Sequence, residues 1–378
     1  MSERAALVAG WGAYVPERVV TNADLERALV TTDAWITTRT GIRERRWADP
    51  GTSTGDMAVH AGRAALRTAG LDRVDRVVLA TTTPDHPCPA TAPWVAHRLG
   101  LGTVPAHDVG AVCSGFVYAL ASARDAILAG SADSVLVVGA DRFSGIVDPS
   151  DRTTAVIFGD GAGAVVLVAG TPGAPGTVDQ VLLGSDGSCA DHIVVRAGGS
   201  RLPVDAATPT ADRYFTMRGG EVFTAAVSRL AEVAASALAH AGWSAEDCDW
   251  LVAHQANRRI LTAVARALGL PDAKVVDDLG RYGNTSAASV PLALAHHADR
   301  FDRGDRIVVA AFGGGTTWGA TTLTWPGDPA ARTAHARATR DRHVPGRHHH
   351  GSPSAGPARG DHHADLVTPA PAGRPRHA

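Results

Sequence analysis

The chain has 378 residues, of which 45% are hydrophobic and 20% are charged, and its formal net charge is −2 at pH 7. This composition is typical of a folded protein and excludes wholesale disorder, a coiled coil and a small disulfide scaffold. Only one of the 36 basic residues is a lysine, Lys274, which argues against a lysine-rich surface for nucleic acid.

The apolar segments and the cysteines bear on where the protein works. No run of about 18 apolar residues could span a membrane, and residues 1–10 lack the long apolar core of a secretory signal. The four cysteines, Cys88, Cys113, Cys189 and Cys248, have no paired spacing, so we expect reduced thiols without disulfides or a metal site. We therefore expect a cytoplasmic protein that contacts neither membrane nor nucleic acid.

Two stretches of the chain predict the same order of strand, helix, short strand, turn, helix and strand. The first stretch has these elements at 77–81, 94–99, 107–109, 113, 116–128 and 134–139. The second has them at 250–253, 258–268, 275–277, 284–286, 288–298 and 306–310. Position 78 corresponds to 251 with an offset of 173, and 113 to 285 and 135 to 307 with an offset of 172. A constant offset predicts a duplicated α/β fold, with its functional site where the strand ends of both halves face each other.

The duplication and a change of composition divide the chain into three predicted parts. Residues 1–175 form the first half and residues 176–325 the second. Residues 326–378 contain 8 Pro, 8 His and 8 Arg against 4 Asp, which predicts a disordered tail with a charge of about +4. Its histidine-rich stretches, 348–350 and 362–363, lie among Pro and Gly, so we expect no evolved metal site there.

Cys113 follows a short predicted strand and precedes a predicted helix. A sulfur at a helix N-terminus lies near unpaired N–H groups and the positive end of the helix dipole, which favour the thiolate. We expect a catalytic nucleophile at this position. The alternative is a small, buried structural cysteine.

His254 and Asn284 occupy places in the second half where α/β units carry functional groups. His254 lies at the C-terminal end of a predicted strand, and Asn284 lies in a turn that enters a helix. A structural histidine and a helix-capping asparagine are the alternatives. The corresponding positions of these residues and Cys113 in the two halves favour one shared site.

Two glycine-rich motifs need different interpretations. Residues 159–164, Gly-Asp-Gly-Ala-Gly-Ala, resemble a dinucleotide-binding fingerprint, but Val165–Val168 predicts a strand where that motif needs a helix. We expect these glycines to permit close backbone packing instead. The glycines at 313–315 follow the last predicted strand and either donate an N–H to an oxyanion or form a flexible turn.

Seven motifs follow one another in a fixed order: Thr21–Glu26, Trp35–Arg45, Cys113–Phe116, Phe158–Ala164, His254–Asn257, Gly283–Pro291 and Phe312–Gly319. Together they resemble the motifs of the β-ketoacyl-acyl-carrier-protein synthase III family, in the thiolase superfamily. The resemblance covers residues 4–325 and leaves the tail outside. It implies a thiolase-like, five-layered αβαβα fold built from two duplicated halves, and a homodimer.

The resemblance also implies a reaction in two stages. Cys113 would attack the thioester of an acyl-CoA, with the N–H groups of Cys113 and Gly314 as the oxyanion hole. Malonyl-acyl-carrier-protein would then lose CO₂, and His254 with Asn284 would stabilise the resulting enolate. The product would be a β-ketoacyl-acyl-carrier-protein that initiates fatty acid or polyketide synthesis. No cofactor is implied, because acyl-CoA is a substrate.

The same match assigns residues to the entrance for CoA. Trp35 and Arg152 would sandwich the adenine, because a planar guanidinium stacks well on aromatic rings. The pantetheine and phosphate tunnel would be lined by Arg39, Thr40, Asn257 and Arg259.

Two positions depart from the family pattern. Thr224 stands where a lysine is common, which implies a weaker electrostatic hold on CoA or the carrier protein. Cys88 stands where members that prefer short straight chains place an aromatic residue at the end of the acyl pocket, across the dimer interface. The smaller side chain predicts that branched or longer acyl groups are accepted.

Three other functions compete with condensation. A degradative thiolase would carry a second cysteine before the C-terminal glycines, where Ala311 and Phe312 stand. A structural partner subunit would have lost the nucleophile. Transfer of the acyl group to a hydroxyl or amine is the alternative that stays open, although the presence of Asn284 favours condensation.

Overall fold

Two sheets with corresponding strand orders organise the computed structural model, which describes residues 4–327. The first sheet has the order β1-β7-β6-β4-β5, from Ala5–Tyr14, Gly161–Gly170, Ser134–Asp141, Arg76–Ala80 and Ala106–Val109. The second has the order β8-β13-β12-β11, from Leu182–Ser185, Thr317–Thr324, Arg306–Gly313 and Trp250–Ala253. The predicted tail beyond Gly327, with its histidine-rich stretches, lies outside the described residues.

The strand directions confirm the internal duplication. In the first sheet β4 pairs parallel with β6, and β6 pairs antiparallel with β7. In the second sheet β11 pairs parallel with β12, and β12 pairs antiparallel with β13. A parallel bridge between Leu251 and Val275 takes the place that β5 has in the first sheet. The boundary between the halves at 175 stays a prediction.

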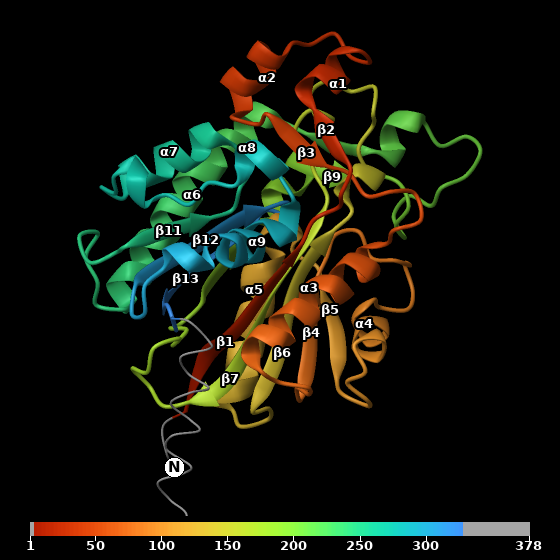
Figure 1. Ribbon diagram of the computed structural model, residues 1–378. Coiled ribbons are helices and arrows are strands. Elements are labelled where there is room, and N and C mark those ends of the chain that lie inside the picture. The colour runs from red at the N-terminus through yellow and green to blue at the C-terminus, as the bar shows by residue number, and fades with distance from the viewer. Residues whose placement is uncertain (1–3, 328–378) are drawn as a thin grey trace, which may run out of the picture. The chain divides into compact units, whose positions relative to one another are not determined.

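Helices form three layers around the two sheets (Figure 1), which gives the five-layered αβαβα arrangement that the sequence predicts. Helices α3 (Thr54–Ala69) and α4 (Ala92–Arg98) cover the outer face of the first sheet. Helices α5 (Gly115–Leu128) and α9 (Ser289–His296) contact strands of both sheets, so they form the central layer. Helix α6 (Gly219–His240) covers the second sheet, and α7 (Arg258–Ala267) packs beside it and shares a hydrophobic cluster with that sheet.

Smaller elements gather at one end of the molecule. They comprise β2 (Val19–Thr21), α1 (Asn22–Glu26), α2 (Asp33–Thr40), β3 (Glu44–Arg46), β9 (Ile193–Val195), β10 (Phe215–Met217) and α8 (Leu279–Tyr282). Apolar residues of these elements pack with Phe143 and Phe158 in one buried cluster. This cluster lies beside the strand ends, where the functional site was expected.

The glycine motif at 159–164 leads into strand β7, so the interpretation as a packing motif is confirmed. A Cβ atom on Gly163 would lie 2.4 Å from the backbone nitrogen of Leu292 and 2.6 Å from the carbonyl carbon of Pro291. Only a residue without a side chain lets α9 pack this closely on β7. The motif therefore sets the position of the central helix and, with it, of the turn that precedes α9.

Helix α6 is the one helix in the described part of the chain that is long and apolar enough to cross a membrane. It packs instead against β12 and β13, and it buries Leu230, Val233 and Leu238 in the core of the second half. Its hydropathy is explained by this packing.

Candidate active site

The turns at Cys113 and Asn284 and the end of β11 meet at one pocket of about 690 Å³, including its open mouth. Its polar lining comes from Cys113, His254, Asn257 and Asn284. Most of the wall is apolar and includes Ile157, Phe158, Ile193, Phe215, Met217, Val222, Phe223, Ala226, Leu230, Ile260 and Phe312. A largely apolar pocket with a few convergent polar groups is typical of a site for a small-molecule substrate.

Cys113 lies in a short 3₁₀ turn, Val112–Ser114, between β5 and α5. Val112 has φ of +47°, an unfavourable conformation for a β-branched residue that a well-packed site must stabilise. A Cβ atom on Gly313 would lie 2.7 Å from the backbone nitrogen of Cys113. The glycine at the end of β12 therefore permits the close approach of two backbones beside the sulfur.

The pKa of the Cys113 thiol is raised to about 12, mainly because the group is buried. The nearby Asp141 carboxyl contributes to this rise, whereas the Ser286 hydroxyl opposes it. The expectation of a thiolate from the helix N-terminus alone is therefore wrong for the resting protein. The residue is 8% exposed, so the loss of hydration outweighs the helix dipole. A protonated thiol must lose its proton as it reacts.

His254 lies at the end of β11 and is 3% exposed. Its backbone N–H donates to Ala310 in the neighbouring strand at 2.8 Å, which fixes the residue at the strand end. Its Nδ1 lies 2.6 Å from the hydroxyl of Ser289, the first residue of α9. Burial lowers the pKa of His254 to about 3, so the imidazole is neutral at physiological pH.

Hydrogen bonds of its backbone and side chain hold Asn284 in place. Its backbone N–H donates to Ile157 at 2.9 Å, and its carbonyl accepts from the N–H of Gly159 at 2.9 Å. Its side-chain Oδ1 accepts from the backbone N–H of Ser286 at 2.9 Å. With the oxygen occupied in this way, the amide nitrogen is the end of the side chain that is available to a ligand.

The predicted entrance residues Trp35, Arg39 and Arg152 come together on the surface. The guanidinium carbon of Arg152 lies 4.9 Å from the centre of the Trp35 ring, and that of Arg39 lies 5.8 Å from it. Arg152 also donates to the carbonyl of Val30 at 2.8 Å. Trp35 and Arg152 touch each other here, so an adenine between them requires Arg152 to swing aside.

The other predicted tunnel residues differ in exposure. Asn257 lines the pocket, caps α7 by accepting from Arg259 N–H at 2.8 Å, and donates to the carbonyl of Arg39 at 3.0 Å. Arg259 is exposed and lies over the ring of Phe223, with 5.4 Å between the guanidinium carbon and the ring centre. Thr40 is buried, and its hydroxyl donates to Ile36 within its own helix at 2.7 Å.

Of the predicted site residues, Cys113, His254, Asn257 and Asn284 line the pocket, and the entrance residues Trp35, Arg39, Thr40, Arg152 and Arg259 do not. Gly314 and Cys88 do not line the pocket of their own chain either. Gly314 lies next to it, against Ile193 and Val112, while its neighbour Gly313 forms part of the wall. Cys88 is exposed on the loop before α4. The oxyanion role of Gly314 and the acyl-pocket role of Cys88 stay predictions.

Behind the pocket lies a stack of three phenylalanines that the sequence does not predict. Phe143 stacks on Phe158 at 4.1 Å between ring centres, and Phe215 meets both rings edge-on, at 5.0 and 4.9 Å. Phe158 and Phe215 also line the pocket. No local pattern could reveal this stack, because its members come from three segments that only the tertiary fold brings together.

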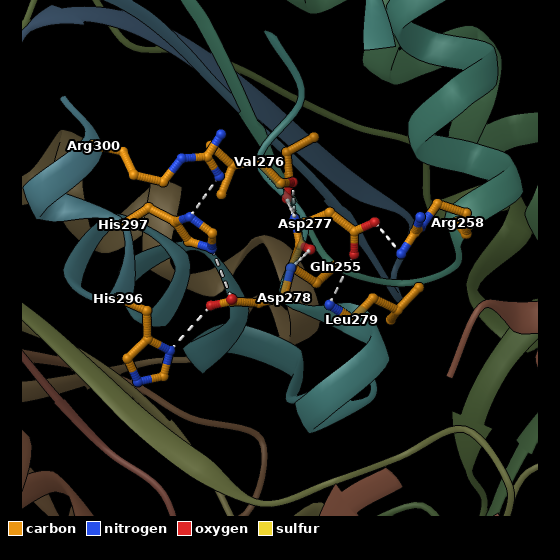
Figure 2. Close-up of polar contacts among 10 residues, drawn as sticks. Gln255, Arg258, Val276, Asp277, Asp278, Leu279, His296, His297 and Arg300 are labelled. Atoms are coloured by element: carbon orange, nitrogen blue, oxygen red, sulfur yellow. Dashed lines mark hydrogen bonds and ion pairs between the residues drawn. The ribbon is translucent and has the colours of Figure 1, made fainter. Parts of the chain in front are cut away.

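The C-terminal end of α9 is anchored by a buried carboxylate, Asp278 (Figure 2). His296 Nδ1 and His297 Nε2 lie 3.0 and 2.8 Å from its two oxygens, and Arg300 contacts the other ring nitrogen of His297 at 2.9 Å. Burial opposes ionisation of Asp278, but the hydrogen bonds from both histidines outweigh it, so its pKa is lowered. Helix α9 is thus held at the end opposite to Ser289.

Comparison with known families agrees with this geometry. Residues 107–187 match the family model described as 3-oxoacyl-(acyl-carrier-protein) synthase III, and residues 238–325 match its C-terminal model. The chain is 55% identical over 328 residues to β-ketoacyl-(acyl-carrier-protein) synthase III 3 of Streptomyces coelicolor. That match covers 85% of this chain and 98% of the relative.

Solved structures give the same result. The crystal structure of 3-oxoacyl-(acyl-carrier-protein) synthase III, FabH, from Pseudomonas aeruginosa PAO1 is 48% identical, with a TM-score of 0.80 over 85% of this chain and 98% of that one. The priming β-ketosynthase of the R1128 polyketide biosynthetic pathway is 34% identical, with a TM-score of 0.82 over 87% and 98%. The thiolase-like fold predicted from the sequence is confirmed.

Proposed function

This chain belongs to the β-ketoacyl-acyl-carrier-protein synthase III family, and from that premise we propose that it condenses an acyl-CoA with malonyl-acyl-carrier-protein. It is a transferase of fatty acid biosynthesis. The observation that carries the proposal is the convergence of a thiol, an imidazole and a primary amide in one apolar pocket. The thiol can accept an acyl group and the two N–H donors can stabilise an enolate, whereas transfer to a hydroxyl or amine would use only the first.

In the first stage, Cys113 takes the acyl group from acyl-CoA. Its sulfur bonds to the thioester carbon, the bond from that carbon to the CoA sulfur breaks, and the thiol hydrogen leaves with CoA. We assign the tetrahedral oxyanion to the N–H groups of Cys113 and Gly314. Support comes from Gly313, whose missing side chain lets these two backbones approach each other.

In the second stage, malonyl-acyl-carrier-protein loses CO₂ and leaves an enolate. Uncharged His254 and the amide nitrogen of Asn284 stabilise the enolate oxygen, and the enolate carbon attacks the acyl group on Cys113. The bond from sulfur to the acyl carbon breaks, and Cys113 regains a proton from solvent. Loss of CO₂ supplies the electron pair, so this stage needs no strong base.

The substrates reach the pocket from the surface where Trp35 and the arginines lie. We assign the adenine to Trp35 and Arg152, and the pantetheine and phosphates to Arg39, Thr40, Asn257 and Arg259. The exposed guanidinium groups suit phosphate contact, and Asn257 lies on the pocket wall itself. Thr224, exposed on the first turns of α6, gives a weaker hold on CoA or the carrier protein than a lysine would.

We also propose that the enzyme is a cytoplasmic homodimer without a cofactor. Strand β5 lies at the edge of the first sheet and, in the part of the chain that the structure describes, pairs with β4 alone. Its open edge can extend the sheet into a second copy. Four free cysteines suit a reducing compartment.

Cys88 of one protomer would border the acyl pocket of the other, with room for branched or longer starters for fatty acids or polyketides.

The test is intact-protein mass spectrometry after incubation with acetyl-, isobutyryl- and octanoyl-CoA, followed by addition of malonyl-acyl-carrier-protein. We expect an acyl adduct on the wild type and on the Cys189→Ala control, but not on Cys113→Ala, and its conversion to β-ketoacyl-acyl-carrier-protein. An adduct that only a hydroxyl or amine acceptor removes would replace condensation by acyl transfer. Preferred loading of the acetyl group would contradict the role of Cys88.

A further inference from the structure

Ser289 is a buried residue next to the catalytic imidazole that the mechanism above does not use. It is 2% exposed, and its hydroxyl oxygen lies 2.6 Å from Nδ1 of His254. The backbone N–H of Gln255 also points to this oxygen, at 3.4 Å. In the part of the chain that the structure describes, these are the two hydrogen-bond partners of the hydroxyl.

The number of hydrogens decides the direction of the short contact. A serine hydroxyl has one hydrogen to donate, and a neutral imidazole carries one hydrogen on either ring nitrogen. If Nδ1 carried the ring hydrogen, the Ser289 oxygen would accept hydrogen bonds from both Nδ1 and the N–H of Gln255. The buried hydroxyl hydrogen of Ser289 would then have no acceptor, which is unfavourable. If Ser289 donates to Nδ1, the hydroxyl hydrogen and the Gln255 N–H are both paired. The ring hydrogen of His254 is then on Nε2.

We infer that Ser289 is a positioning residue that keeps His254 in the Nε2–H form, so that the imidazole presents a donor to the substrate. This inference rests on the proposed function. In this form His254 can donate to the enolate oxygen, but Nε2 cannot accept the proton of Cys113 and Nδ1 is occupied. Ser289 therefore serves the decarboxylation stage and not the loading of the acyl group.

The surroundings keep Ser289 in register with His254. The side chain of Gln255 donates to the carbonyls of Ala253 and Val276, at 2.7 and 3.2 Å, and accepts from the N–H of Asp278 at 2.9 Å. Figure 2 shows Gln255 among Val276, Asp278 and Leu279. Because Asp278 also anchors the far end of α9 through His296 and His297, the helix is fixed at both ends relative to β11.

The direct test is ¹⁵N NMR of the wild-type protein labelled with [¹⁵N]histidine, without substrate. The His254→Ala variant identifies the His254 signals by their absence. We expect Nε2 to be protonated and Nδ1 to be an unprotonated acceptor. A proton on Nδ1 would overturn the inference. This measurement needs no altered Ser289, so it stands even if a substitution there prevents folding.

The kinetic test compares Ser289→Ala with Thr322→Val, a control that removes a buried hydroxyl on β13, bonded to Asp179 at 2.8 Å. We expect Ser289→Ala to release CO₂ from malonyl-acyl-carrier-protein about 10- to 100-fold more slowly, the size of effect known for groups that orient metal-bound histidines. Acylation of Cys113 should stay within about threefold, because it does not use the ring hydrogen. The control should leave both rates unchanged.

Other outcomes have distinct meanings. An equal fall in both rates, or no fall in either, would overturn the inference. Failure of the wild type to form an acyl adduct or a β-ketoacyl product would instead overturn the proposed function, and the NMR result would still decide which nitrogen of His254 carries the hydrogen.

Discussion

Corresponding turns of the two halves carry Cys113 and Asn284. The interactions that hold these two side chains in place differ. Each turn contains a non-glycine residue with positive φ, Val112 at +47° and Ser286 at +51°. Asn284 has three hydrogen bonds from its backbone and side chain to Ile157, Gly159 and Ser286. Cys113 lies instead in apolar surroundings that raise its pKa.

This difference suits the roles that we propose for the two groups. An amide that stabilises an enolate works best when its donor is already oriented, because no reorganisation is then needed during the reaction. A thiol that forms and breaks covalent bonds must be accessible to the substrate, and the charge on its sulfur changes during the reaction. The two halves contain corresponding turns. Hydrogen bonds hold the side chain of Asn284 in one of them, and the other carries the thiol that we propose as the nucleophile.

The largest expected effect comes from breaking the rigid turn. Asn284→Ala removes one of the two donors that we propose for the enolate, so kcat for condensation should fall about 10²- to 10³-fold, as for other oxyanion-hole donors. Acyl loading measured by intact mass should stay normal. A variant that lost both activities together would mean that Asn284 serves the fold and not the second stage.

The reactive turn can be tested by alkylation of Cys113 with iodoacetamide as pH is varied. Because burial raises the pKa of this thiol to about 12, the thiolate fraction rises with pH throughout the accessible range. The rate should increase about 100-fold between pH 7 and pH 9. Peptide mass mapping separates Cys113 from the exposed Cys88. A plateau near pH 7 would show a thiolate at rest.

The imidazole should show no titration in the same range. Burial lowers the pKa of His254 to about 3, so the ring gains a proton only in strong acid. The rate of CO₂ release should not follow the protonation of an ordinary histidine, with a pKa near about 6.5. Such a step, present in the wild type and absent from His254→Ala, would contradict a neutral donor.

The packing beneath the rigid turn can be tested with glycine substitutions. Gly163→Ala would place a Cβ atom 2.4 Å from the backbone nitrogen of Leu292, so α9 must move away from β7. Overpacking of this kind lowers the free energy of unfolding by about 1–3 kcal/mol. Gly187→Ala is the matched control, because its Cβ would meet nothing within 4 Å. Equal urea midpoints for the two variants would contradict the proposed contact.

The smallest effect is expected at the far end of α9. Asp278→Asn should lower the free energy of unfolding by about 1–2 kcal/mol at pH 7, because it weakens charge-assisted hydrogen bonds to His296 and His297. The pKa of Asp278 is lowered in the fold, so its contribution is complete above about pH 4 and is lost as pH falls further. Urea unfolding at pH 7 and at pH 3 should therefore show a larger difference at pH 7. The exposed Asp133→Asn serves as the control.

The sequence predicts those parts of the site that depend on the order of elements along the chain. The repeated strands, helices and turns placed Cys113, His254 and Asn284 at corresponding strand ends or turns, because each element has its own pattern of apolar residues and glycines. Ser289 lies 35 positions from His254, and their contact depends on how α9 packs on β7. The raised pKa of Cys113 likewise depends on burial by distant segments, and the phenylalanine stack joins residues 143, 158 and 215. Such contacts leave no periodic signal in the sequence.

The most direct test of the division between the two turns is to measure both half-reactions in Cys113→Ala and Asn284→Ala. Acyl loading is read by intact mass, and CO₂ release is read from labelled malonyl-acyl-carrier-protein without acyl-CoA. We expect Cys113→Ala to release CO₂ but take no acyl group, and Asn284→Ala to take the acyl group but release little CO₂. Loss of both half-reactions in both variants would contradict the assignment of one stage to each turn.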